Sequence, residues 1–241
     1  MLLKEIIYKR KSVRKYKVEP VSEEIKREIE AFYLGAKPLY PDIKVRAEIL
    51  NREEVKSMFA WTPSQVVVLY SEEKDGYLEN AGFLLQQLEL YLGTLGLGAC
   101  WLGMGKPEVG AKKEEKEGLK FVIMLAFGYP NEELYRENAQ FKRKALSAIS
   151  DREDERLEAA RLAPSSVNSQ PWYFTHEGEL IHAYCSKQGL LKWLALGQMN
   201  RIDMGIALAN LYVENPETFR FFRSETAQEL KGHKYVGSFT L

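Results

Sequence analysis

The order of hydrophobic and polar positions predicts alternating strands and helices. Two short apolar runs, 66–70 and 121–127, have the β-branched and apolar content that is typical of buried strands. Between them, apolar residues recur every three or four positions from Glu79 to about Gly96. This spacing predicts a long helix in the core.

Local signals predict further helices. Ser22 precedes two glutamates, and a short acceptor side chain with an acidic first turn favours a helix, here ending near Gly35. A capping box that begins at Ser150 predicts another helix through Arg161. We also expect a helix over 51–59.

The end of the chain predicts a hairpin followed by helix. The runs 172–175 and 180–184 are separated by a Glu-Gly turn, as in a β-hairpin. Residues 190–213 read as one or two helices. The tail from Glu214 has no clear period, so the pattern predicts no element there.

A weak repeat relates two of the predicted helices. Gly82-Phe-Leu-Leu-Gln-Gln-Leu resembles Gly205-Ile-Ala-Leu-Ala-Asn-Leu, at an offset of 123 residues (205 − 82). A glycine inside a helix costs about 1 kcal/mol relative to alanine, which close helix packing can offset. The repeat indicates an internal duplication, and coincidence is the alternative.

Composition and charge exclude several classes of protein. With 45% hydrophobic and 28% charged residues the chain is an ordinary folded protein, not a disordered one. The 34 basic and 34 acidic residues cancel, so no global field attracts nucleic acid or an anionic membrane. Cys100 and Cys185 form no Cys-x-x-Cys pair and are expected to be buried free thiols. The N-terminus has no apolar signal region, and we expect a cytoplasmic protein.

A basic cluster near the N-terminus suits a phosphate group. Arg10, Ser12 and Arg14 form an Arg-x-Ser-x-Arg motif within 9–15. Guanidinium groups and a hydroxyl that converge on phosphate oxygens hold a dianion well, because Arg binds it in a bidentate manner. A solvated basic helix end and a nucleic-acid patch are the alternatives.

A second feature is the segment 163–172, Ala-Pro-Ser-Ser-Val-Asn-Ser-Gln-Pro-Trp. Two prolines stiffen this segment, while serine and asparagine groups can reach a planar polar ligand without burying a charge. An ordinary polar turn is the alternative. The three histidines, by contrast, have no metal-ligand spacing.

Together, four motifs resemble the flavin-dependent nitroreductase family. They are the Arg-x-Ser-x-Arg motif, the Pro-Ser-Ser-x-Asn-x-Gln-Pro-Trp string from Pro164, the Gly-Leu-Gly-Ala-Cys-Trp-Leu-Gly run over 96–103, and a strand that ends in Gly128-Tyr-Pro. The resemblance covers the chain to about Val213. It implies an FMN cofactor, which in that family lies at a homodimer interface and is held by one motif from each subunit.

The resemblance also implies which residues hold FMN. The phosphate would be held by Arg10, Lys11, Ser12 and Arg14, joined by Lys142 and by Arg143 or Lys144. The flavin ring would meet Pro164, Ser165, Ser166 and Asn168, with the backbone at Gly103 and Met104 directed at N5, the atom that receives hydride. Asn51 is a candidate for the ring edge.

The order of the motifs departs from ordinary family members. Their proline-serine loop follows the basic motif by about thirty residues, whereas here that position reads Gly-Ala-Lys-Pro-Leu-Tyr-Pro over 35–41. The second half, in turn, has no Arg-x-Ser-x-Arg before its helix. This resembles a fused subgroup, typified by a nitroreductase of a thermophile, in which one chain imitates the family dimer.

We therefore expect an α+β, nitroreductase-like fold with a first half over 1–149 and a truncated second copy over 150–241, sharing one core. The resemblance implies an FMN-dependent oxidoreductase that takes electrons from NAD(P)H and passes them to a nitroaromatic, quinone or similar small molecule. It also implies a monomer that acts as a pseudo-dimer, with no nucleic-acid or membrane partner. A flavin-binding module without turnover is the alternative.

Overall fold

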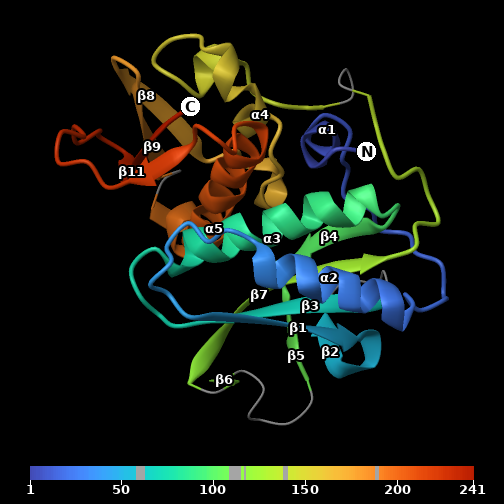
Figure 1. Ribbon diagram of the computed structural model, residues 1–241. Helices are drawn as coiled ribbons and strands as arrows, with labels where there is room; N and C mark the ends of the chain where they lie inside the picture. Colours follow the sequence, from blue (N-terminus) through green and yellow to red (C-terminus); the bar gives the residue numbers. More distant parts are fainter. Residues whose placement is uncertain (58–62, 109–114, 117, 138–140, 188–189) are drawn as a thin grey trace.

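A computed structural model describes the chain except for residues 58–62, 109–114, 117, 138–140 and 188–189. Two antiparallel sheets lie on either side of a pair of crossed helices (Figure 1). The crossed helices are α3 (Tyr77–Thr94) and α5 (Leu190–Glu214). The mixed helix and sheet architecture confirms the expected α+β class.

The first sheet lies below α3 and α2 in Figure 1. Its strand order is β1-β3-β7-β4, and every neighbouring pair is antiparallel. The strands are β1 (Val45–Asn51), β3 (Gln65–Ser71), β7 (Leu119–Gly128) and β4 (Gly98–Leu102), with the short β6 (Glu115–Lys116) beside β7. A separate ribbon joins β2 (Val55–Ser57) to β5 (Gly105–Pro107). The strands predicted over 66–70 and 121–127 are confirmed.

The second sheet is built from the end of the chain, with strand order β10-β11-β9-β8. The predicted hairpin is confirmed as β8 (Trp172–Glu177) and β9 (Leu180–Ser186). The sequence pattern missed β10 (Arg220–Phe222) and β11 (His233–Thr240). In β11 the small residues Gly237 and Ser238 are buried, so the strand lacks the alternation that would have revealed it.

Three shorter helices complete the fold. They are α1 (Leu3–Ile7), α2 (Glu23–Gly35) and α4 (Glu158–Arg161). The predicted cap of α2 is confirmed, since the Ser22 side chain accepts a hydrogen bond from the Ile25 amide. Single-turn 3-10 helices lie at η1 (Arg52–Glu54), η3 (Leu146–Ala148), η4 (Glu155–Leu157) and η5 (Ser166–Asn168).

Two expected helices are wrong in whole or in part. Over 51–57 the chain forms the end of β1, then η1 and β2; 58–59 lie outside the described residues. The helix expected from Ser150 begins later, because the Asp154 side chain caps η4 by accepting from the Arg156 amide at 2.9 Å. Ser150 instead lies next to Phe174 of β8 as an isolated bridge, which holds the residues before Asp154 in a non-helical path.

The crossing of α3 and α5 depends on two glycines. A Cβ atom built on Gly82 would lie 2.1 Å from the carbonyl oxygen of Ile202, and one on Gly205 would lie 1.9 Å from that of Glu79. The contacts are reciprocal, because both glycines and both carbonyls are related by the offset of 123 residues. The backbones can therefore approach this closely only where neither helix has a side chain.

Both halves of the sequence contribute to one core. The main cluster of buried apolar residues includes Val67 and Leu88 from the first half, and Phe174 and Leu208 from the second. Cys100 and Cys185 are free and buried, as predicted.

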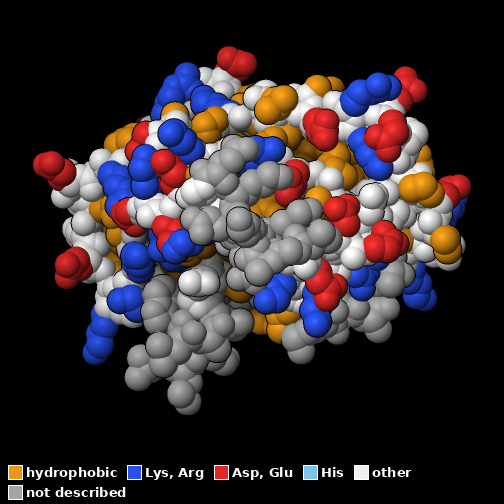
Figure 2. Space-filling view, turned by 90° about the horizontal axis from the view of Figure 1, so that it is seen from below, with side chains coloured by type: hydrophobic (Ala, Val, Ile, Leu, Met, Phe, Trp, Pro, Cys, Tyr) orange, Lys and Arg blue, Asp and Glu red, His pale blue; other side chains and the backbone are white. Residues whose placement is uncertain are grey.

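On the face below the first sheet, charged side chains of both signs surround small apolar areas (Figure 2). Among the described residues no helix has both the length and the apolar character needed to cross a bilayer.

We predict that Gly205→Ala lowers the stability of the fold. The added methyl group would meet a backbone carbonyl, which cannot rotate away, so the helices must separate. Overpacking of this kind costs about 1 to 3 kcal/mol. Chemical denaturation measures the loss of unfolding free energy. The control is Gly35→Ala in α2, where a Cβ meets nothing within 4 Å; equal stability of both variants would contradict the prediction.

Candidate functional site

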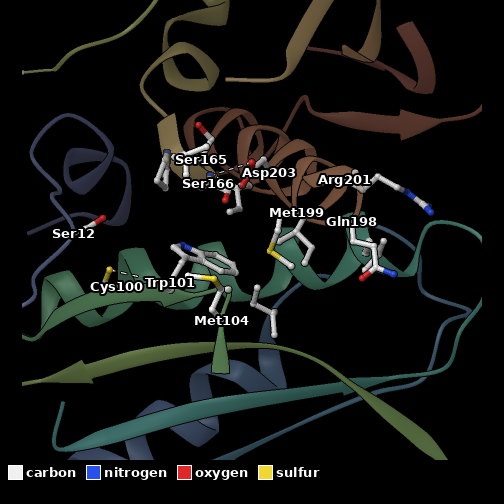
Figure 3. A pocket seen from close by; sticks show the side chains of 18 of the residues that line it. Ser12, Cys100, Trp101, Met104, Ser165, Ser166, Gln198, Met199, Arg201 and Asp203 are labelled. Carbon is white, nitrogen blue, oxygen red and sulfur yellow. Dashed lines mark hydrogen bonds between the residues drawn. The ribbon is translucent and has the colours of Figure 1, made fainter. Parts of the chain in front are cut away.

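A cavity of about 990 Å³ lies between the first sheet and α5. Figure 3 shows Ser12 at one end of it, Gln198 and Arg201 toward the other, and Trp101, Met104 and Met199 between them. The cavity lining comes from β4, from α5 and from the segment 164–167, so both halves of the sequence form its walls. This size falls within the range of small-molecule and cofactor sites.

The first sheet positions the basic motif. Ser12 forms a parallel bridge with Ala99 of β4, and the Val13 amide donates to the Ala99 carbonyl at 2.9 Å. Gly98 makes this possible, because a Cβ there would lie 2.7 Å from the Val13 side chain. As a result Ser12 and the exposed Arg14 both line the cavity.

An acidic side chain fixes the path of the basic segment. One oxygen of Glu132 accepts from the amides of Arg14 and Lys15, at 2.7 and 3.0 Å, and the other pairs with Lys11 at 3.1 Å. Although partial burial opposes ionisation, these hydrogen bonds lower the pKa of Glu132. Lys11 is therefore directed at Glu132 and does not line the cavity.

Arg10 lies behind the cavity wall. Its side chain is 5% exposed and pairs with the buried Glu89 of α3 at 3.0 Å. The same guanidinium nitrogen donates to the Ser12 hydroxyl at 3.1 Å. Its Nε is buried and has no hydrogen-bond partner among the described residues. Arg10 thus orients Ser12 while keeping one donor unsatisfied.

Two further arginines lie near Arg10. The Arg136 Nε donates to the Arg10 carbonyl at 3.0 Å, and its guanidinium lies 3.8 Å from the Phe141 ring centroid. Burial and the charge of Arg10 lower the pKa of Arg136 to about 10. Burial, and then the charges of Arg10 and Arg136, lower the pKa of Arg143 to about 10. Arg136 and Arg143 remain cationic at neutral pH, so this region repels further cations and attracts an anion.

Arg143 also supports the proline-serine segment. It donates to the carbonyls of Leu162 and Ala163 at 3.2 and 3.0 Å, and to the Asn168 side chain at 2.9 Å. Asn168 in turn donates to the Lys142 carbonyl at 3.1 Å. Lys142, Arg143 and Asn168 therefore bind one another beside the cavity, and none of them lines it.

The segment after Pro164 has an unusual backbone. Val167, Asn168 and Gln170 have φ values of 47°, 55° and 47°, in the left-handed region that non-glycine residues rarely adopt. Each such residue costs about 1 to 3 kcal/mol and persists only where the surroundings hold it. One contact that holds this backbone lies within the segment itself, since the Ser165 hydroxyl accepts from the Gln170 amide at 2.9 Å.

A buried carboxyl group faces this segment from α5. Both oxygens of Asp203 lie 3.1 Å from the Ser166 amide, which donates to them, and the Ser169 hydroxyl donates at 3.5 Å. Asp203 is only 3% exposed and lines the cavity (Figure 3). Burial raises its pKa to about 8, although both hydrogen bonds favour the ionised form. The group is therefore largely protonated at neutral pH.

The comparison with known protein families identifies the family of the chain. Residues 2–215 match the model of the family described as "Putative TM nitroreductase". The chain belongs to this nitroreductase family. The family name is that of an oxidoreductase, and the expected nitroreductase-like fold is confirmed. No curated protein sequence matches the chain significantly.

Solved structures of nitroreductases resemble the fold. A nitroreductase from Thermotoga maritima MSB8 has a TM-score of 0.65 at 19% identity, over 99% of this chain and 92% of that one. An FMN-dependent nitroreductase from Clostridium difficile R20291 has a TM-score of 0.45 at 18% identity, over 57% and 93%. An NADH oxidase from Clostridium acetobutylicum has a TM-score of 0.46 at 21% identity, over 62% and 99%.

The cavity brings together seven of the site residues that the sequence predicted for this nitroreductase. They are Ser12, Arg14, Gly103, Met104, Pro164, Ser165 and Ser166. The structure places five outside the lining, namely Arg10, Lys11, Lys142, Arg143 and Asn168. Lys144 binds Gln170, and Asn51 is exposed at the end of β1 and does not line the cavity. A direct contact of these residues with FMN stays a prediction.

Sequence reasoning missed several cavity residues. Trp101 belongs to the run over 96–103, in which only the backbone at Gly103 was given a role, and Met199 lies in α5 outside any of the predicted motifs. The sequence did contain a sign that Asp203 is special, because it is a single acidic residue within the apolar run that contains Gly205. The described residues contain no group of three His, Cys, Asp or Glu side chains placed to hold a metal ion.

We predict that Asp203→Asn changes how stability depends on pH. In the unfolded chain an aspartate titrates near pH 3.9, about four pH units below the folded value. The folded state therefore holds a proton that the unfolded state has lost, so the Asp203 contribution falls as pH rises from about 4 to about 8. The variant lacks this titration and should gain stability relative to the natural protein over that range.

Urea denaturation at pH 5, 6.5 and 8 measures this gain. The control is Asp42→Asn at an exposed aspartate, which should follow the natural protein at each pH. A difference between Asp203→Asn and the natural protein that stays constant from pH 5 to pH 8 would show that Asp203 is ionised throughout.

Proposed function

We propose that this nitroreductase is an FMN-dependent oxidoreductase that takes electrons from NAD(P)H and reduces a small molecule such as a nitroaromatic or a quinone. The observation that carries the proposal is that one cavity joins Ser12 and Arg14 to Gly103, Met104 and the segment from Pro164. These are the two sets of residues that the resemblance to flavin-dependent nitroreductases assigns to the phosphate and the ring of FMN. The FMN and NADH in the names of similar structures support the same choice of cofactor and donor.

The residues present fit a flavin nucleotide. At one end, Arg14 and the Ser12 hydroxyl would hold the phosphate, and the unsatisfied Nε of Arg10 lies behind them as a further donor. In the middle, Trp101, Met104 and Met199 offer apolar surface for a planar ring. When bound, FMN supplies the chemistry, accepting two electrons as a hydride and passing them on.

The protein's own contribution is binding, orientation and charge. The cations Arg10, Arg136 and Arg143 attract the phosphate and keep it at the end of the cavity near Ser12. The strained turn after Pro164 presents short polar groups to the ring without a formal charge. The remaining length of the cavity, toward Gln198 and Arg201, leaves room for the electron donor or acceptor.

We further propose that the chain is an internal duplication that imitates a dimer, with halves over 1–149 and 150–241. The reciprocal contacts of Gly82 and Gly205 are those that a two-fold axis produces between identical helices. Each half has lost one motif, so the two sites of a dimer are reduced to one. The cavity then needs no second chain, and the protein acts as a monomer.

Absorbance spectroscopy tests the function directly. The purified protein should carry a flavin spectrum that bleaches when NADH or NADPH is added without oxygen, and that returns when a quinone or nitroaromatic is added. A flavin spectrum that persists would favour the alternative, a flavin-binding module without turnover. Colourless protein that takes up no added FMN would reject both.

We predict that Arg14→Ala weakens FMN binding by about tenfold to a hundredfold. A hydrogen bond to a charged group contributes about 1.5 to 3 kcal/mol, and Arg14 is exposed, so its removal leaves the core intact. Fluorescence titration of the protein without flavin measures the affinity. Arg27→Ala, at an exposed arginine of α2, is the control. An affinity within twofold of the natural one would place the phosphate elsewhere.

We predict one FMN per chain and no requirement for association. Ser12 and Ser165 line the same cavity of one chain, so dilution should not separate the two halves of the site. Sedimentation at low concentration should detect a 27.7 kDa species that keeps its flavin. Release of flavin in step with dissociation of a dimer would instead mean that the site forms between chains.

A further inference from the structure

Two turns that contain a proline are held in the same way by the crossed helices. On α3, the Asn80 side-chain oxygen accepts from the amides of Leu39 and Tyr40, at 2.9 and 3.0 Å. On α5, the Asp203 carboxyl accepts from the Ser166 amide at 3.1 Å. In both turns the amide of the second residue after the proline, Pro38 or Pro164, donates to the helix.

The two acceptors occupy matching positions. Asn80 and Asp203 are separated by the same 123 residues as Gly82 and Gly205, and each lies two residues before its glycine. Both side chains are buried, with 0% and 3% of their surface exposed. The turn held by Asp203 lines the cavity, whereas neither Asn80 nor the turn that it holds is part of the lining.

We propose that Asp203 is a positioning residue that sets the turn after Pro164 in the wall of the cavity, and that Asn80 is its purely structural counterpart. The Ser166 amide donates to Asp203. The other contacts that hold the turn bind backbone groups on either side of Ser166, namely the Ala163 carbonyl and the Gln170 amide. Val167 and Asn168, in the left-handed region directly after Ser166, cannot hold this path by local preference alone. Asp203 therefore determines where the groups expected to meet the flavin lie.

The test compares matched variants at the two positions. Amide hydrogen exchange is measured for Asp203→Ala and Asn80→Ala without flavin, over peptides that cover 164–168 and 38–41. Loss of the acceptor should speed exchange about tenfold in the turn that each residue holds, and leave the other turn unchanged. Asp203→Asn keeps an acceptor oxygen and should retain the protection. Unchanged exchange over 164–168 in Asp203→Ala would overturn the inference.

The affinity for FMN separates positioning from general stability. This step rests on the proposed function. Asp203→Ala should bind FMN about tenfold more weakly, while Asp203→Asn and Asn80→Ala should stay within about twofold of the natural protein. Faster exchange with an unchanged FMN affinity in Asp203→Ala would overturn the positioning role. If the natural protein does not bind FMN, the proposed function fails, and the exchange results still decide whether Asp203 holds the turn.

A second variant serves if Asp203→Ala does not fold. Ser166→Pro removes the donor instead of the acceptor, and the extended backbone of Ser165 suits the residue before a proline. Faster exchange at 167–169 in this variant supports the inference. Exchange equal to that of the natural protein would overturn it.

Discussion

The close crossing of α3 and α5 is the contact on which the rest of the structure depends. Helices with side chains at their contact usually lie 8 to 10 Å apart, and here Gly82 and Gly205 let each backbone touch the other. This approach brings Glu79 within reach of Arg201, with distances of 2.7 and 2.8 Å, and Gln86 within 3.1 Å of Asn210. These two polar pairs, one partly buried and one buried, depend on the crossing to hold their members in place.

The same crossing connects two parts of the cavity wall. Along α3, Glu89 pairs with Arg10, and Arg10 orients Ser12 at one end of the cavity. Along α5, Asp203 holds the turn after Pro164. The two groups of site residues are far apart in the sequence, yet each is attached to one of the two helices. Their separation across the cavity is therefore set by the angle and distance of the crossing.

The sequence predicted most of the elements that form this scaffold and only part of the site. Long segments such as α3 were clear, because their apolar residues recur at helical spacing along the sequence. The helix expected over 51–59 failed because an extended edge strand and a 3-10 turn can carry the same local composition. The helix start predicted at Ser150 was wrong for another reason. The capping pattern at Ser150 competes with the one at Asp154, and the bridge between Ser150 and β8 decides between them.

Two of the predicted site residues act through contacts that no local pattern records. Arg10 belongs to the motif that we expect to bind phosphate, yet its position is decided by Glu89, a buried carboxylate some eighty positions later in the chain. Arg143 carries a charge suited to phosphate, yet it binds three acceptors of the turn that ends at Asn168. In both cases a cation serves the site by holding a neighbour in place. A motif identifies residues that belong to one site, whereas the fold decides which of them reach the ligand.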